Sequence, residues 1–112
     1  MDLAFADPKH EKLLNDYEAL SRRYNKKKGI DSATAILSAI NVLKAAPTLA
    51  EVPRGYRPHP LRGSYKGCFA VDVDRVNRVI FRPNQEKDPT YRIDNFKSIK
   101  SMLILAIFED YH

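Results

Sequence analysis

The sequence predicts an α+β domain in which two N-terminal helices pack on a small twisted antiparallel β-sheet. Three observations predict this fold class. Apolar residues recur at helical spacing only in the first half of the chain, two-residue alternation begins after Pro53, and an uninterrupted apolar run spans Met102 to Phe108. At 112 residues, the chain is expected to form one domain covering residues 1–112.

The first helix is expected to begin at Pro8, with Asp7 as its N-cap, after a short strand over residues 2–6. One apolar face then continues to about residue 24, formed by Leu13, Tyr17, Leu20 and Tyr24. Three lysines and Gly29 follow at residues 26–29. Cations at a helix C-terminus and a glycine after it both favour an end to the helix there.

The second helix is expected to be capped by Asp31 or Ser32 and to end before Pro47, which cannot continue a helix. Its apolar face consists of Ala33, Ile36, Leu37, Ile40 and Leu43. Because the basic turn between the two helices is short, they are predicted to form an antiparallel hairpin.

The second half of the chain is typical of strands. Along residues 68–73, large apolar side chains alternate with small or polar ones, as on a strand whose two faces differ. A turn is expected over 74–77, and Arg78 to Arg82 form the returning strand. A polar excursion over residues 83–100 then interrupts the sheet. Residues 102–108 are continuously apolar, which predicts a central strand covered on both faces.

The composition is that of an ordinary globular protein, with 44% hydrophobic and 29% charged residues. The longest apolar run is too short to cross a bilayer, and the N-terminus lacks a signal-peptide pattern, so a cytoplasmic protein without a membrane partner is expected. The net charge of +5 favours an anionic partner such as nucleic acid, although solubility alone also accounts for mild basicity.

The segment of residues 54–66 holds four cations, two tyrosines, one histidine and no acid. Cations bind phosphate oxygens and tyrosine rings stack on bases, so this composition is typical of single-stranded nucleic-acid sites. The candidate contacts are Arg57, Arg62, Tyr65 and Lys66. A solvated hairpin loop has the same composition, and the segment alone does not decide between the two.

His59 lies between two prolines, which restrict the directions of its imidazole, although such prolines also simply shape turns. Asp110, Tyr111 and His112 follow the last apolar strand, with Asp110 and His112 expected on one side. Neighbouring carboxylates favour the protonated form of His112, which suits a general acid, while a polar fringe on a buried strand is the simpler explanation.

No metal site or cofactor is expected. The three histidines share no metal-ligand spacing, and His10 is interpreted as an exposed surface residue. The single cysteine, Cys68, excludes an internal disulfide and is expected to be a small core residue. The adjacent carboxylates Glu109 and Asp110 are weak grounds for a magnesium site.

Four motifs in this order resemble the HigB-type killer toxins of the RelE/ParE superfamily of bacterial toxin–antitoxin modules. They are His59-Pro60-Leu61-Arg62-Gly63, Gly67 to Val71, Asn77 to Phe81, and Glu109-Asp110-Tyr111-His112. The likeness covers roughly the whole chain. It departs at residues 62–66, where Tyr65 stands at a commonly basic position, and in the longer excursion over 83–100.

The resemblance implies a ribosome-dependent endoribonuclease that cuts translated mRNA in the A site. The family's catalytic positions carry over to His59, Asp110, Tyr111 and His112, and a phosphate-contacting arginine carries over to Arg78. Metal-independent attack by the 2′-hydroxyl would use His59 and His112 as base and acid, in an order that the sequence leaves open.

The resemblance also implies partners: a cognate HigA-like helix-turn-helix antitoxin, mRNA and the ribosomal A site, and operator DNA through the toxin–antitoxin complex. Two alternatives remain. ParE-like members share the fold but inhibit DNA gyrase without cutting RNA, and charge alone is compatible with a non-enzymatic nucleic-acid-binding module. The pairing of His59 with the motif at residues 110–112 favours the nuclease.

Overall fold

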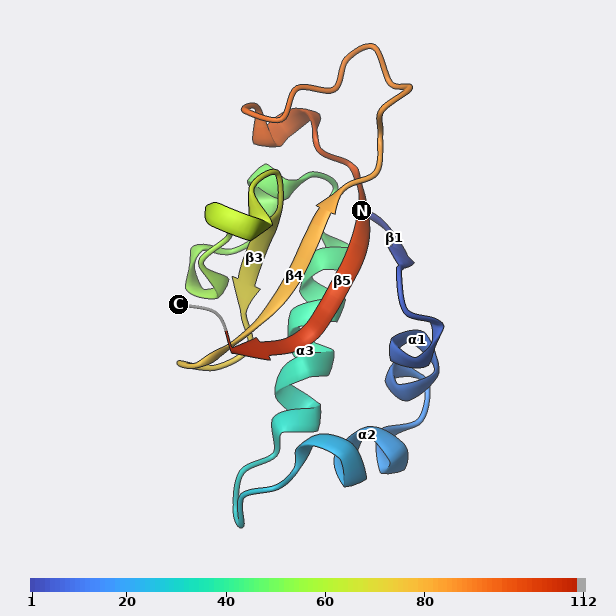
Figure 1. Ribbon diagram of the computed structural model, residues 1–112, viewed down its shortest axis with the longest axis vertical. Coiled ribbons are helices and arrows are strands. Elements are labelled where there is room, and N and C mark those ends of the chain that lie inside the picture. The colour runs from blue at the N-terminus through green and yellow to red at the C-terminus, as the bar shows by residue number, and fades with distance from the viewer. Residues whose placement is uncertain (111–112) are drawn as a thin grey trace.

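The computed structural model describes residues 1–110; Tyr111 and His112 lie outside the described residues. Within this range the strands form a five-stranded sheet in the order β1-β5-β4-β3-β2 (Figure 1). The strands are β1 (Asp2–Phe5), β2 (His59–Pro60), β3 (Phe69–Asp72), β4 (Asn77–Pro83) and β5 (Ser101–Asp110). The predicted α+β class, with helices against a sheet, is confirmed.

The sheet is mixed rather than purely antiparallel, because β1 runs parallel to β5 while the other neighbours are antiparallel. The hairpin between β3 and β4 fixes their antiparallel direction. β1 and β5 come from opposite ends of the sequence, so no turn between them sets their relative direction.

The helix expected over residues 8–24 is two helices, α1 (Pro8–Leu14) and α2 (Tyr17–Tyr24). The break follows from Asn15 and Asp16. Asp16 adopts an extended backbone, and its carboxylate accepts from the Ala19 N–H at 3.2 Å, so it begins a new helix. The apolar spacing continues across the break, which is why spacing alone predicts one helix.

The third helix, α3 (Ser32–Ala45), is capped by Asp31, as predicted. The Asp31 carboxylate accepts from the Thr34 N–H at 3.0 Å, from the Thr34 hydroxyl at 2.6 Å and from the Tyr17 hydroxyl at 2.6 Å. These donors, Thr34 first, hold the pKa of Asp31 far below its ordinary value. The same carboxylate therefore joins α2 to α3.

The main core lies between α3 and one face of the sheet. Figure 1 shows α3 crossing behind β4 and β5. Its members are almost fully buried, and they include Ile36, Ile40 and Leu43 from the helix and Phe69, Val71, Val79, Phe81, Met102, Ile104 and Ile107 from the strands. Among residues 1–110, no helix is both long and apolar enough to cross a membrane.

The other face of the sheet is covered only in part. A smaller cluster of Leu61, Cys68, Ala70 and Ile80 lies on it. On β5, alternate residues such as Leu103 and Leu105 remain half-buried. The last strand is an interior strand, between β1 and β4, although β4 rather than β5 is the middle strand of the sheet. The prediction that both its faces are covered is wrong, because the segment over residues 61–68 is too short to cover the sheet. The uncovered part of this sheet face leaves room for polar side chains.

The excursion after β4 is held to the sheet by Gln85, which is 8% exposed. The Gln85 amide nitrogen donates to the Ser98 carbonyl at 3.0 Å and to the Asp88 carboxylate at 3.0 Å. Its oxygen accepts from the backbone N–H groups of Lys100 and Ser101. One buried side chain thus joins the two ends of the excursion.

Replacing Gln85 by alanine is expected to lower the free energy of unfolding by about 1–3 kcal/mol, because buried backbone groups lose their partner. Residues 86–98 should also become more sensitive to limited proteolysis. Urea denaturation and protease digestion test this, with Glu86→Gln as the control at the exposed neighbouring position. Equal stability and equal digestion of the two variants would contradict the anchoring role.

Candidate functional site

Polar side chains gather on the sheet face that lies opposite α3. Residues paired across neighbouring strands point to the same face. One row across the sheet consists of His59, Ala70, Ile80 and Ala106. The next row consists of Asp72, Arg78 and Glu109. An imidazole, two carboxylates and a guanidinium therefore occupy adjacent rows of one face.

Local backbone geometry fixes the orientation of the half-buried His59 ring. Its Nδ1 lies within hydrogen-bonding distance of the Arg57 carbonyl. A carbonyl only accepts, so Nδ1 carries the hydrogen and Nε2 of the neutral ring is left as an acceptor. Arg57 has a φ of 50°, a left-handed conformation that costs a non-glycine residue roughly 1–2 kcal/mol. The fold thus maintains an unfavourable conformation next to the histidine.

Asp72 lies between two arginines. Its carboxylate is 2.9 Å from Nε of Arg78 and 3.6 Å from Nη1 of Arg57. The Arg78 side chain is 9% exposed, whereas that of Arg57 is 66% exposed. The ion pair with Arg78 holds the carboxylate in place, and the carboxylate attracts the exposed guanidinium of Arg57.

Arg78 is mainly committed to the turn between β3 and β4. Its Nη1 donates to the carbonyls of Asp74 at 3.0 Å and Asn77 at 3.2 Å. Its Nη2 also donates to the Arg75 carbonyl at 3.5 Å. A guanidinium shared between a carboxylate and three carbonyls acts as a structural clamp. Direct contact of Arg78 with the scissile phosphate remains a prediction, and the described contacts favour a positioning role.

The other predicted RNA contacts lie around a 3₁₀ turn, η3 (Gly63–Tyr65). Gly63 and Gly67 have φ values of 64° and 89°, which glycine adopts most readily. Arg62 and Lys66 are exposed, while Tyr65 is half-buried against the smaller cluster on the sheet. The structure therefore brings the basic segment to the same sheet face as His59.

At the end of β5, Glu109 lies opposite Arg78 and Asp110 lies opposite Asn77. A register shift between Arg78 and Ile80 places Glu109 in the row of Asp72, where strict alternation from Ala106 would have placed Phe108. Sequence reasoning did not place Glu109 opposite Arg78, because alternation does not reveal a bulge. The predicted sites Tyr111 and His112 lie outside the described residues.

No metal-binding group of three or more His, Cys, Asp or Glu side chains occurs within residues 1–110. Cys68 is buried in the smaller cluster, as predicted. Burial raises the pKa of its thiol, and a protonated thiol is a poor nucleophile.

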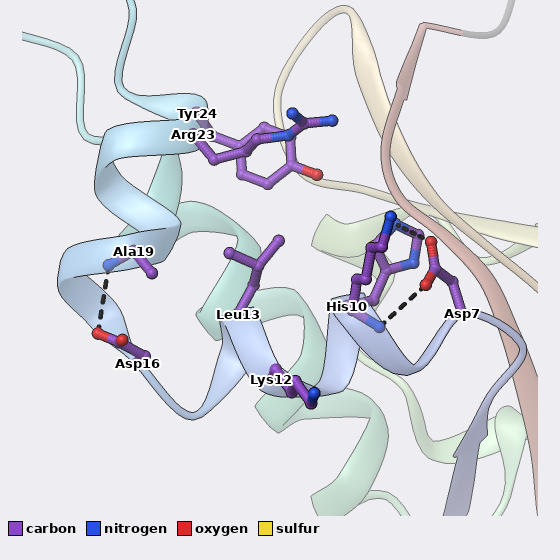
Figure 2. A pocket seen from close by; sticks show the side chains of 9 residues that line it. Asp7, His10, Lys12, Leu13, Asp16, Ala19, Arg23 and Tyr24 are labelled. Atoms are coloured by element: carbon purple, nitrogen blue, oxygen red, sulfur yellow. Dashed lines mark hydrogen bonds and ion pairs between the residues drawn. The ribbon is translucent and has the colours of Figure 1, made fainter.

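The interpretation of His10 as an exposed histidine is wrong. Its side chain is 20% exposed and lies 3.8 Å from the Asp7 carboxylate. Figure 2 shows the two side chains facing each other at the start of α1, with Arg23 and Tyr24 of α2 across a cavity of about 430 Å³. The helical break at Asp16 opens this cavity, which shares no lining residue with the His59 face.

No family model matches the sequence, and no curated protein matches it. Solved structures do match. The YoeB/ParE toxin from Agrobacterium tumefaciens is 17% identical, with 100% of each chain covered and a TM-score of 0.54. The chain has a RelE/ParE-type toxin fold.

Two further structures agree with this fold. A YoeB–YefM complex from Staphylococcus aureus is 13% identical, with a TM-score of 0.52 over 100% of this chain and 97% of the other. A mutant of YafQ from E. coli is 16% identical, with a TM-score of 0.51 over 93% of this chain and 87% of the other. These likenesses establish the toxin fold, and the chemistry has to be argued from the residues.

Arg78→Lys is expected to lower the free energy of unfolding by about 1–3 kcal/mol, because an ammonium retains the charge but cannot contact the carboxylate and the three turn carbonyls together. Arg75→Lys, at an exposed position of the same turn, is the matched control. Chemical denaturation and amide exchange at residues 74–77 provide the measurement. Equal behaviour of the two variants would contradict the clamp.

Proposed function

We propose that this protein is the toxin of a type II toxin–antitoxin module and cleaves translated mRNA on the ribosome. The orientation of His59 carries the proposal, because its ring presents Nε2 as an acceptor beside clustered arginines. The toxin fold and the HigB-like motifs support the same function. Among cellular anions, a phosphodiester with a neighbouring hydroxyl fits this pairing of base and cations.

RNA cleavage without a metal needs a base for the 2′-hydroxyl and an acid for the departing 5′-oxygen. His59 takes the base role in this proposal, since its Nδ1–H is bound to the Arg57 carbonyl and Nε2 can accept the hydroxyl proton. His112 takes the acid role. In this proposal Asp110 orients that histidine or favours its protonated form. Tyr111 stacks on a base or donates a hydrogen bond from its hydroxyl.

The phosphate gains negative charge in the transition state and needs positioned cations. Arg57 suits this role because its guanidinium is mostly exposed and its contact to Asp72 is long, at 3.6 Å. Arg62 and Lys66 extend the positive surface on the same side. Arg78 adds positive charge at longer range while it holds Asp72 in place. The proposed mechanism thus separates a structural arginine from the arginine that meets RNA.

A toxin of this kind needs a cognate antitoxin. One similar solved structure is a heterotetrameric complex of the YoeB–YefM toxin–antitoxin pair from Staphylococcus aureus. We propose a HigA-like helix-turn-helix partner for this chain, with operator DNA bound through the complex and mRNA bound in the ribosomal A site. Because all of these partners are cytoplasmic, we propose the same location for this protein.

His59→Gln is expected to reduce mRNA cleavage by about 10²–10⁴-fold, the usual contribution of a general base. Glutamine is close in size but cannot take a proton at neutral pH. The assay is a purified translation system with primer extension to map cuts, run with and without ribosomes. His10→Gln is the matched control, because His10 lies at a different cavity.

Cuts within translated codons that require ribosomes and His59, but not His10, would support the proposal. Full cutting by a folded His59→Gln protein would contradict the role of His59. An absence of cutting by the unchanged chain would contradict the nuclease, and a gyrase supercoiling assay would then test the ParE-like alternative.

A further inference from the structure

A second cavity, of about 390 Å³, lies where the excursion meets the segment after η3. Pro60, Ile93 and Phe96 form apolar parts of its lining, and Lys66 and Asp94 supply its charged groups. The basic segment predicted to bind RNA thus meets the excursion that sets this chain apart from shorter relatives. Neither Ile93, Asp94 nor Phe96 has a role in the mechanism described above.

The apolar lining suits a flat ring. The Phe96 ring is held edge-on against Phe69, with centroids 5.3 Å apart, which fixes its orientation. Ile93 is 48% exposed although it is large and apolar. A proline, an isoleucine and a phenylalanine around one opening provide the surfaces on which nucleobases stack or pack.

The part of the excursion that carries Asp94 is held firmly from within. The Ser98 Oγ lies 2.8 Å from the Arg92 carbonyl and 2.7 Å from the Asn95 carbonyl, which share its single hydrogen, and it accepts from the Arg92 N–H at 2.8 Å. Ser98 is itself buried. A carboxylate placed by such a braced loop loses little entropy when it binds a ligand.

The two charged lining residues, Asp94 and Lys66, distinguish the bases by the hydrogen-bond donors and acceptors on each base edge. A carboxylate has two acceptor oxygens, and an ammonium donates hydrogen bonds. Guanine alone presents two adjacent donors on its Watson–Crick edge, N1–H and the 2-amino group, next to the O6 acceptor. Adenine and cytosine offer one amino group beside an acceptor, and uracil offers one N–H between two acceptors. Asp94 and Lys66 therefore complement guanine better than any other base.

The cavity is also adjacent to the proposed site of cleavage. Leu61 and Cys68 line the cavity and lie on the same sheet face as His59. Two residues after Cys68 on β3, Ala70 pairs with His59, and two residues later Asp72 contacts the arginines. On this face His59, beside Ala70, thus lies between the cavity and the cations. We propose that this cavity binds a guanine base of the mRNA next to the scissile phosphate and sets the preferred cleavage sequence. This inference rests on the proposed nuclease function.

The test maps cleavage sites for the unchanged chain, Asp94→Asn and the control Glu86→Gln, an exposed carboxylate of the same excursion outside the cavity. The unchanged chain and the control should cut preferentially next to guanine. For Asp94→Asn, the ratio of cutting next to guanine to cutting elsewhere should fall about tenfold, as expected for a lost bidentate base contact. The variant should still cut other sequences.

Cutting without a guanine preference, or an Asp94→Asn variant that keeps the preference, would overturn the inference while leaving the nuclease intact. An unchanged chain that does not cut would instead contradict the proposed function. The two failures are therefore distinguishable.

A binding experiment needs no catalysis. Guanosine, adenosine, cytidine and uridine 5′-monophosphates are titrated into the full chain and followed by amide NMR. We expect the guanosine nucleotide to bind most tightly and to shift the signals of Ile93, Phe96 and Lys66, and Asp94→Asn to weaken this binding about tenfold. Equal binding of all four nucleotides, or shifts elsewhere only, would overturn the inference.

Discussion

The buried ion pair between Arg78 and Asp72 is the interaction on which the rest of the site depends. Arg78 forms an ion pair with Asp72 on β3 and donates hydrogen bonds to the carbonyls of the β3–β4 turn. Asp72 in turn attracts Arg57, and the Arg57 carbonyl holds His59. Because neighbouring contacts share a residue, one partly buried chain of polar groups runs from the turn to the imidazole.

The sequence predicts those parts of the fold whose causes are local. Asp31 caps α3 because a carboxylate stands before a run of helical apolar spacing, and the β3–β4 hairpin follows from alternation around a polar turn. Asp16 has the same capping chemistry. It lies within an apolar pattern that continues on both sides, so the pattern predicts one helix where the caps make two. The parallel placement of β1 is nonlocal and leaves no such signal.

The residues of the candidate site also differ in whether their placement can be predicted from local sequence. His59 and its basic neighbours are predictable because they lie in one segment that the hairpin carries to the sheet. Glu109 is not, since a bulge in β5 decides which terminal carboxylate faces Arg78. The cavity around Asp94 requires two segments far apart in the sequence to meet, and the buried Gln85 that anchors one of them gives no sign of this in the sequence.

The central claim is that the backbone at Arg57 fixes the His59 tautomer and leaves Nε2 as the base. Two-bond proton–nitrogen correlation NMR of the neutral imidazole, in the full chain, reports this tautomer directly. We predict the Nδ1–H form for His59. Observation of the Nε2–H form would mean that the acceptor nitrogen faces the Arg57 carbonyl, and it would contradict the proposed role of His59 as general base.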